Sequence, residues 1–249
     1  MSHKNLNGSL SEKMYPNYYL CILADMIGSR QSSKPKWLPE IVDKLNQQAD
    51  PDWIIPFKLR SGDELFSVFT NITAGFRAFF KFHQLAKTYE VGFYVGVGVG
   101  KLEQENLTDQ HRVNGPAIWC ASDALKELKE KPTSEVLKSI SKLNFRYNLH
   151  GSENKNLNLA LEIYLHFLMH RIEARTQQQN LAIQLLEEYP EWSNAQRYWA
   201  VSGTDEITVP RAYATANFSK LLARADYHSI CEAEEKLIVL LQNLMSLEP

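Results

Sequence analysis

The stretch VGFYVGVGVG at residues 91–100 alternates strictly between large and small side chains. Its large apolar residues share one face of the expected strand; they are Phe93, Val95, Val97 and Val99. The other face carries glycines and Tyr94. Glycines with a period of two indicate a β-strand, whereas the dinucleotide-binding motif GxGxxG places them in a strand-to-helix turn. We therefore reject a Rossmann-type site and predict a strand whose bare face lets a helix or a ligand approach its backbone closely.

The segments before this strand predict further strands of the same sheet and two helices. YYLCILA at 18–24 is an apolar run of strand length that stops at Asp25, which is typical of a strand buried on both faces. Two further runs flank SGDE and predict a β-hairpin with an acidic tip; they are Trp53–Arg60 and Leu65–Phe69. Helices are expected over 38–47 and 72–86, because apolar residues recur there at helical spacing.

The segments after it divide the chain into two domains. Pro116 follows Asn-Gly and starts a helix expected to reach Lys131, and alternation over 143–149 predicts one more strand. Every later element is predicted to be a helix. We expect an α+β fold with this organisation: a flexible leader at 1–16, a sheet domain at 17–151, a linker at 152–156 and an all-helical domain at 157–249.

The composition is that of a globular protein with a core. Of the 249 residues, 44% are hydrophobic and 22% are charged, which excludes a disordered, collagen-like or coiled-coil chain. No apolar run approaches the roughly 20 residues that span a bilayer, and the N-terminal stretch has no apolar signal core. The three widely spaced cysteines fit reduced thiols. We therefore expect a cytoplasmic protein with no membrane partner.

Charge is distributed unevenly along the chain. Residues 1–175 carry 22 basic and 19 acidic side chains, whereas residues 176–249 carry 5 and 10. Neither part has the dense basic surface on which strong nonspecific nucleic-acid binding depends. Any binding to DNA must therefore come from a local patch.

Three carboxylates form the first candidate site. Asp25 ends the first strand, and Asp63 and Glu64 stand at the hairpin tip beside it. Carboxylate oxygens at this spacing suit Mg²⁺, which keeps several waters and brings nucleotide phosphates with it. The alternative is that Asp25 caps a turn and the other two are ordinary tip residues.

Backbone and basic groups near these acids are candidates for phosphate binding. Ile27, Gly28 and Ser29 precede a helix, so their N–H groups are expected to face bound phosphates. Lys58, with Arg60 on the same strand face, supplies positive charge or is a solvated edge residue.

The second candidate site is a helix expected over 209–225, started by Thr208 and Pro210. Opposite its apolar face lies a stripe of residue types that contact bases and phosphates in DNA; they are Tyr213, Asn217, Lys220 and Arg224. The alternative is a solvated helix face on an acidic part of the chain.

His166 and His170 stand four residues apart within an expected helix that also holds Glu162 and Glu173. Catalytic zinc sites of the HExxH type use this histidine spacing with a glutamate directly after the first histidine, but Phe167 stands there. From sequence we interpret the pair as a helix surface or a contact between domains.

Four stretches resemble the SatD family of bacterial proteins over about residues 18–131. They are ADMIGSR at 24–30, FKLRSGDELFSVF at 57–69, VGVGVG at 95–100 and VNGPAIWCASDALKELK at 113–129. TANFSKLLARADYHSICEAEE at 215–235 resembles, more loosely, the helix-turn-helix segment of that family. The N-terminal stretches are also similar to the ferredoxin-like palm domain of class III nucleotide cyclases and diguanylate cyclases.

The resemblance to the palm domain implies a metal site but not standard cyclase activity. It places the two metal-binding carboxylates at Asp25 and Asp63, with Glu64 matching the hairpin glutamate of diguanylate cyclases. Trp119 and Asp123 stand where class III cyclases have a catalytic Asn and Arg. An indole cannot replace a carboxamide, and an Asp repels a triphosphate, so standard cyclase chemistry is not expected.

Three functions follow as hypotheses. The first is a regulator whose palm domain binds a nucleotide with Mg²⁺ and whose helix-turn-helix-like domain binds DNA weakly or binds a protein partner. The second is a nucleotide-processing enzyme that uses Asp25 and Asp63, with the helical domain serving dimerisation or control. The third is a scaffold without catalysis. We rank the regulator first.

Overall fold

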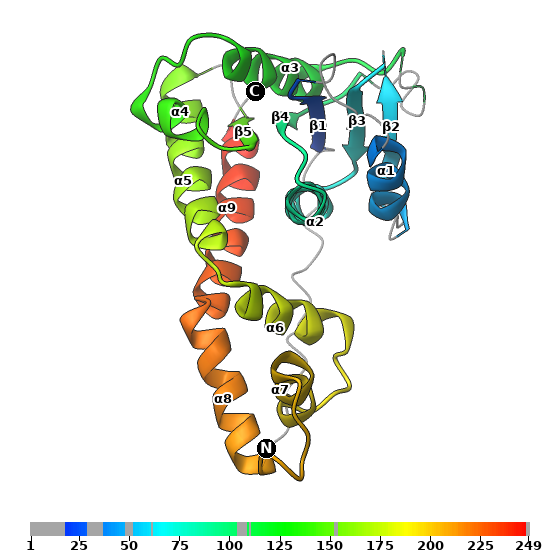
Figure 1. Cartoon of the computed structure of the whole chain (residues 1–249). Coiled ribbons are helices and arrows are strands. Elements are labelled where there is room, and N and C mark those ends of the chain that lie inside the picture. The colour runs from blue at the N-terminus through cyan, green and yellow to red at the C-terminus, as the bar shows by residue number, and fades with distance from the viewer. Residues whose placement is uncertain are drawn as a thin grey trace. The chain divides into compact units, whose positions relative to one another are not determined.

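The chain is an α+β protein with a helical C-terminal part. The computed structural model describes residues 18–28, 37–47, 52–60, 62–103, 109, 111–151 and 154–247 (Figure 1). These residues form two units. The sheet unit combines the described residues up to Ile163 with those from Ile238 onward, and the helical unit is Tyr164–Leu237. The division therefore runs through two long helices rather than through the expected linker at 152–156.

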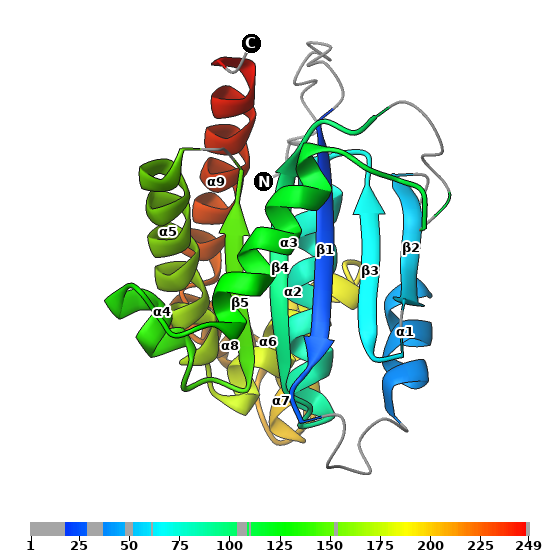
Figure 2. The same cartoon turned by 90° about the horizontal axis from the view of Figure 1, so that it is seen from above.

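Five strands form one mixed sheet in the order β2-β3-β1-β4-β5 (Figure 2). They are β1 (Tyr19–Met26), β2 (Trp53–Arg60), β3 (Glu64–Phe69), β4 (Phe93–Gly100) and β5 (Phe145–His150). β1 is antiparallel to both of its neighbours, β3 and β4, and β5 is parallel to β4. All five strands were expected from the alternation and the apolar runs, with boundaries within two residues.

Helices cover both faces of the sheet. α1 (Leu38–Asn46) and α2 (Ile72–Thr88) lie on one face, and α3 (Pro116–Lys129) lies on the other (Figure 2). Asn71 caps the start of α2, because its side chain accepts a hydrogen bond from the Ala74 N–H. A six-residue helix, α4 (Glu135–Ile140), begins at Ser134 and was missed in the sequence, since it is too short to show a period.

The bare face of β4 is occupied by α3. A Cβ atom placed on Gly96 would lie 2.1 Å from the carbonyl oxygen of Ala121, and one on Gly98 would lie 2.1 Å from that of Ala117. Both distances are far below van der Waals contact, so no residue with a side chain fits at either position. Of the two partners expected for this face, a helix or a ligand, the structure shows the helix.

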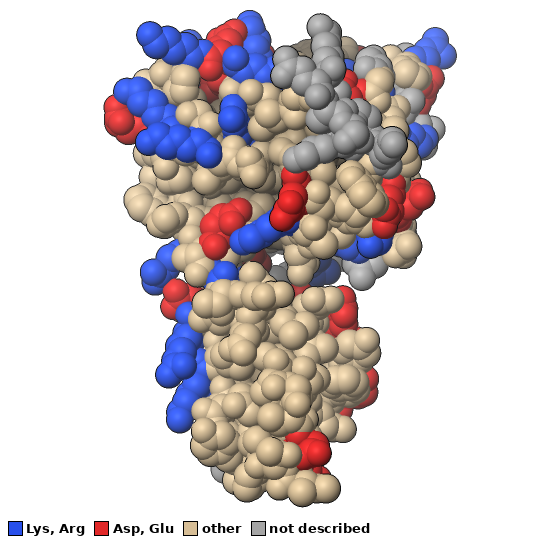
Figure 3. All heavy atoms as spheres, viewed as in Figure 1, with Lys and Arg blue, Asp and Glu red and all other residues tan. Residues whose placement is uncertain are grey.

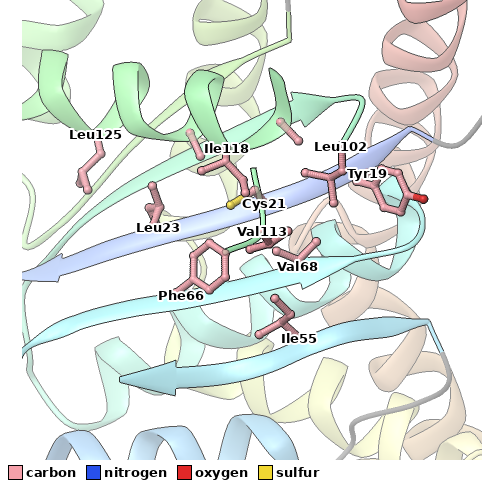
Figure 4. Close-up of a cluster of buried hydrophobic side chains, with 12 residues drawn as sticks. Tyr19, Cys21, Leu23, Ile55, Phe66, Val68, Leu102, Val113, Ile118 and Leu125 are labelled. Carbon is pink, nitrogen blue, oxygen red and sulfur yellow. The ribbon is translucent and has the colours of Figure 1, made fainter. Parts of the chain in front are cut away.

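Apolar side chains on the same face complete the contact between α3 and the sheet (Figure 4). Strands β1, β2 and β3 contribute one set to this cluster: Tyr19, Cys21, Leu23, Ile55, Phe66 and Val68. The helix and the segment before it contribute the other: Leu102, Val113, Ala117, Ile118, Ala121 and Leu125. Burial raises the pKa of the Cys21 thiol, so Cys21 acts here as a small apolar side chain.

The outer edge of β2 is blocked by a side chain. Asn46, the last residue of α1, donates to the carbonyl oxygen of Phe57 and accepts from the N–H of the same residue, at 2.8 and 3.0 Å. Pro56, next to it, has no N–H to offer. The side-chain amide therefore takes the place of a neighbouring strand.

The remaining elements in the described part of the chain are all helices. They are α5 (Lys155–Glu173), α6 (Gln177–Glu188), α7 (Asn194–Ser202), α8 (Arg211–Arg224) and α9 (Tyr227–Leu247). None of the described helices is long and apolar enough to cross a membrane. α6 and α7 each begin with a capping box, at Thr176 and at Ser193.

α8 starts differently from the sequence expectation. Thr208 does not cap it, because the Thr208 N–H and hydroxyl both donate to the Asp205 carboxylate, at 2.8 and 2.6 Å. The N-cap is Pro210, and the first helical residue is Arg211. Thr208 therefore forms a local turn with Asp205 instead of capping the helix.

An arginine holds the end of α8. Arg175 donates through Nε to the carbonyl oxygen of Ala225 at 3.0 Å.

Burial raises the pKa of the nearby Glu234 to about 7; Arg175 opposes this shift, whereas Glu187 and Glu235 add to it. The Glu234 carboxyl is thus protonated more readily in the folded chain than in the unfolded one.

The contact between α3 and β4 predicts that any side chain added on the glycine face of β4 will lower the stability of the fold. We expect Gly98→Ala to lower the free energy of unfolding by at least about 1–3 kcal/mol, because the new methyl group meets α3 backbone atoms that cannot move independently. Denaturant unfolding measures this. Ser122→Ala, on the exposed side of α3, is the control. Equal stability of Gly98→Ala and wild type would contradict the contact.

The raised pKa of Glu234 predicts a pH-dependent stability. The stability that the neutral Glu234 carboxyl contributes is fully present below pH 4.5. It is lost as the pH rises through about 7, because ionisation of this carboxyl is unfavourable in the folded state. Glu234→Gln, which stays neutral, should therefore raise the Tm relative to wild type at pH 8 and leave it unchanged near pH 4.5. Glu232→Gln, at an exposed position of the same helix, should show no such difference between the two pH values.

Candidate functional site

Two of the three predicted carboxylates are neighbours across the sheet. Asp25, near the end of β1, pairs in register with Glu64, the first residue of β3. Directly opposite residues project to the same face with Cβ atoms about 5 Å apart. This is the α3 face, because Asp25 alternates with Leu23 and Glu64 alternates with Phe66, both members of the cluster beneath α3.

Each of these carboxylates already has a basic partner. Asp25 Oδ2 lies 2.5 Å from Lys129 Nζ, at the last residue of α3. Glu64 Oε1 accepts from Arg60 Nε at 2.8 Å, and the Arg60 guanidinium lies over the Phe66 ring. The site is therefore a cluster of two acids and two bases at the edge of the α3 cover.

The hairpin tip holds the third predicted carboxylate. Gly62 adopts a φ of 95°, which favours glycine, and Asp63 follows it, half-exposed, in the turn that leads into β3. In the described part of the chain, no three acidic, histidine or cysteine side chains lie close enough together to hold one metal ion. Joint binding of Mg²⁺ by Asp25, Asp63 and Glu64 stays a prediction.

The predicted phosphate-binding groups are only partly available. The Ile27 N–H donates to the Gly92 carbonyl oxygen at 2.9 Å, so it is already used within the sheet unit. Gly28 is exposed with a φ of 71°, and Ser29 lies outside the described residues. Lys58 is exposed on β2 opposite Phe66.

Lys129 is the site residue that sequence reasoning missed. Its pairing with Asp25 depends on the path of α3, which brings the last turn of the helix to the end of β1. The only sequence signal is a lysine in the last turn of a helix, where basic residues are common for electrostatic reasons.

The two positions that depart from the cyclase pattern both lie on the outer side of α3. Trp119 is 51% exposed, and its Nε1 donates to Asn114 Oδ1 at 2.8 Å. Asp123 is exposed one turn further along. Neither side chain is itself a carboxamide or a cation, although the Asn114 carboxamide lies beside Trp119.

No family model, curated protein or solved structure matches this chain. Its function is therefore inferred from its own residues and their geometry.

The predicted DNA-binding stripe is on the surface of α8. Tyr213 is 59% exposed, Lys220 and Arg224 are exposed, and Asn217 is half-buried with its Nδ2 bonded to the Tyr213 carbonyl oxygen. The opposite face is buried and consists of Ala214, Phe218 and Leu222. Basic side chains follow the α8 side of the helical unit in Figure 3.

α8 packs in a three-helix arrangement with α6 and α7. Ala182 and Ile183 of α6 form a core with Phe218 and Leu222 of α8, and Tyr198 and Val201 of α7 pack against it. Gly203, with a φ of 65°, ends α7 in the left-handed conformation. The connection from Gly203 to Pro210 is longer than the three or four residues typical of a helix-turn-helix.

The connection between α7 and α8 is nevertheless fixed by hydrogen bonds. Trp199 Nε1 donates to the Val209 carbonyl oxygen at 3.0 Å, and Asp205 holds Thr208. On the other side of α7, Arg197 donates to the carbonyl oxygens of Tyr189 and Pro190. Trp199 thus links α7 to the start of α8, and Arg197 links α7 to the segment that follows α6.

The ion pair between Asp25 and Lys129 predicts a competition. If Asp25 binds Mg²⁺, the ammonium group of Lys129 must leave, so Lys129→Ala should increase the affinity for Mg²⁺ several-fold over wild type. Calorimetric titration with Mg²⁺ alone measures this. Lys126→Ala is the matched control, because Lys126 lies one turn earlier and pairs with Glu130 instead. Equal Mg²⁺ affinity in all three proteins would argue against a metal site at Asp25.

Proposed function

We propose that the chain is a regulator that binds DNA through α8 of its helical unit and binds a nucleotide with Mg²⁺ at the Asp25–Glu64 edge of its sheet unit. The proposal joins two sites of different chemistry. The DNA-binding part has the stronger support.

One observation carries the DNA-binding part. Helix α8 contains three basic residues and no acidic one, although the C-terminal part of the chain is acidic as a whole. They are Arg211, Lys220 and Arg224. Lys220 and Arg224 are exposed beside Tyr213, on the side opposite the buried core. A positively charged helix that presents its side chains on a rigid three-helix support is suited to a major groove.

The order of elements in the sheet unit supports the nucleotide-binding part. β1-α1-β2-β3-α2-β4, with β3 between β1 and β2 in the sheet, is the split β-α-β arrangement of ferredoxin-like domains. A cyclase-type palm has this arrangement, and the resemblance places its metal ligands at Asp25 and Asp63. Lys129 and Arg60 then hold the carboxylates before the ligand binds, and they face its phosphates afterwards.

An enzyme acting on a nucleotide is the second candidate. The observation that favours it is the pairing of Asp25 with Glu64, which keeps two carboxylates side by side. Trp119 and Asp123 stand against it. Turnover of ATP or GTP with Mg²⁺ that Asp25→Ala abolishes would promote this candidate over the regulator.

A mobility-shift assay with mixed DNA fragments at low salt tests the regulator. We expect Arg224→Ala to weaken binding to a selected site by about 1–3 kcal/mol if Arg224 contacts a base. Lys220→Ala should weaken binding to all sequences alike and lower the salt slope by about one, because it removes a phosphate contact.

Lys236→Ala is the matched control for these variants. Lys236 is exposed in the same unit but belongs to α9 rather than to α8. Its removal should leave binding unchanged. If wild type shifts no DNA at low salt, or if Lys236→Ala weakens binding as much as Lys220→Ala, the α8 surface is not a DNA-binding surface.

A further inference from the structure

A row of polar side chains crosses the whole sheet on its α3 face. Each strand contributes one residue, paired in register with the residue on the next strand; in order they are Arg60, Glu64, Asp25, Tyr94 and Arg146. Directly paired residues project to the same face of a sheet. All members of the row are half-buried, and Lys129 of α3 reaches its centre at Asp25. The candidate site is therefore the middle of a longer polar row.

Arg146, at the β5 end of the row, has no acidic partner among the described residues. Its Nε donates to the Leu143 carbonyl oxygen and its Nη1 donates to the Tyr94 hydroxyl, both at 3.0 Å. Its Cζ lies 5.0 Å from the centroid of the Tyr94 ring. The bases at the centre and at the other end of the row are both paired with carboxylates. The row and Lys129 together therefore carry one positive charge in excess, at Arg146.

We infer that Arg146 binds a second phosphate of the ligand whose first phosphate is bound with Mg²⁺ at Asp25, an inference that rests on the proposed nucleotide site. The ligand class is then a nucleoside diphosphate or triphosphate rather than a monophosphate. A guanidinium presents a fork of N–H donors that matches the oxygens of a phosphate. The Tyr94 hydroxyl, which accepts from Arg146, keeps its own proton to donate to such an oxygen.

The separation of the two positions favours a chain of phosphates. β4 stands between Asp25 on β1 and Arg146 on β5. Because the Arg146 guanidinium lies over the Tyr94 ring of β4, it is about one strand spacing, roughly 5 Å, from β1. A single phosphate at Asp25 leaves that gap open, whereas linked phosphates follow the row. Bound Mg²⁺ adds to the positive charge of the row, which is then complementary to the several negative charges of such a chain.

Calorimetric titration of the full chain with ATP and Mg²⁺, and separately with inorganic tripolyphosphate and Mg²⁺, tests the inference. We expect Arg146→Ala to weaken the binding of both probes about tenfold to hundredfold, because charge-assisted hydrogen bonds are lost. Arg146→Lys keeps the charge without the fork and should recover part of the loss. Orthophosphate with Mg²⁺ should bind to wild type and Arg146→Ala alike, because one phosphate occupies only the Asp25 end.

Arg77→Ala is the matched control, because Arg77 is exposed on α2, which covers the opposite face of the sheet (Figure 2). It should leave the affinities unchanged. Arg146 also links β4 to β5, so a readout that needs no loss of this side chain separates binding from folding. In ¹H–¹⁵N spectra of wild type, the Arg146 Nε–H, which is bonded to Leu143, should shift when tripolyphosphate is added.

The outcomes separate this inference from the proposed function. If Asp25→Ala abolishes ATP binding but Arg146→Ala binds ATP as tightly as wild type, the role of Arg146 is overturned and the nucleotide site stands. If wild type binds neither ATP nor tripolyphosphate, both are overturned. An equal loss of orthophosphate binding in Arg146→Ala, or an equal loss of ATP binding in Arg77→Ala, would overturn the second phosphate position alone.

Discussion

The close contact between α3 and the glycine face of β4 is the constraint on which the sheet unit depends. Because Gly96 and Gly98 have no side chains, the helix backbone lies directly on the strand, and its alanines fill the remaining space. The distance of α3 from the sheet and the direction of its axis are consequently both fixed. A larger residue at either glycine would lift α3 and open the apolar cluster that joins it to β1 and β3.

The same contact determines what stands at the candidate site. The position of α3 brings its last residue, Lys129, to the carboxylate of Asp25, while the strand register brings Glu64 beside it. A shift of α3 by one turn would remove the ammonium group and leave two adjacent carboxylates without it. The charge balance at this edge of the sheet therefore depends on the packing of α3 against the glycines of β4, several residues away.

Sequence reasoning succeeded where a local pattern has one structural meaning. The period of two in 91–100 and the apolar run before Asp25 identified two central strands, and the helical spacing over 72–86 identified α2. It failed where two local interactions compete or where partners are distant. Thr208 bonds to Asp205 instead of capping α8, and the partner of Asp25 is 104 residues away in sequence.

Asn46 has a consequence for the behaviour of the protein in a crowded cell. An edge strand offers free N–H and C=O groups to the strands of other molecules, and such pairing leads to aggregation. Here the amide of Asn46 satisfies Phe57 on the outer edge of β2, and Pro56 removes the neighbouring donor. One short polar side chain thereby occupies the hydrogen-bonding groups of Phe57 that a strand of another molecule would otherwise use.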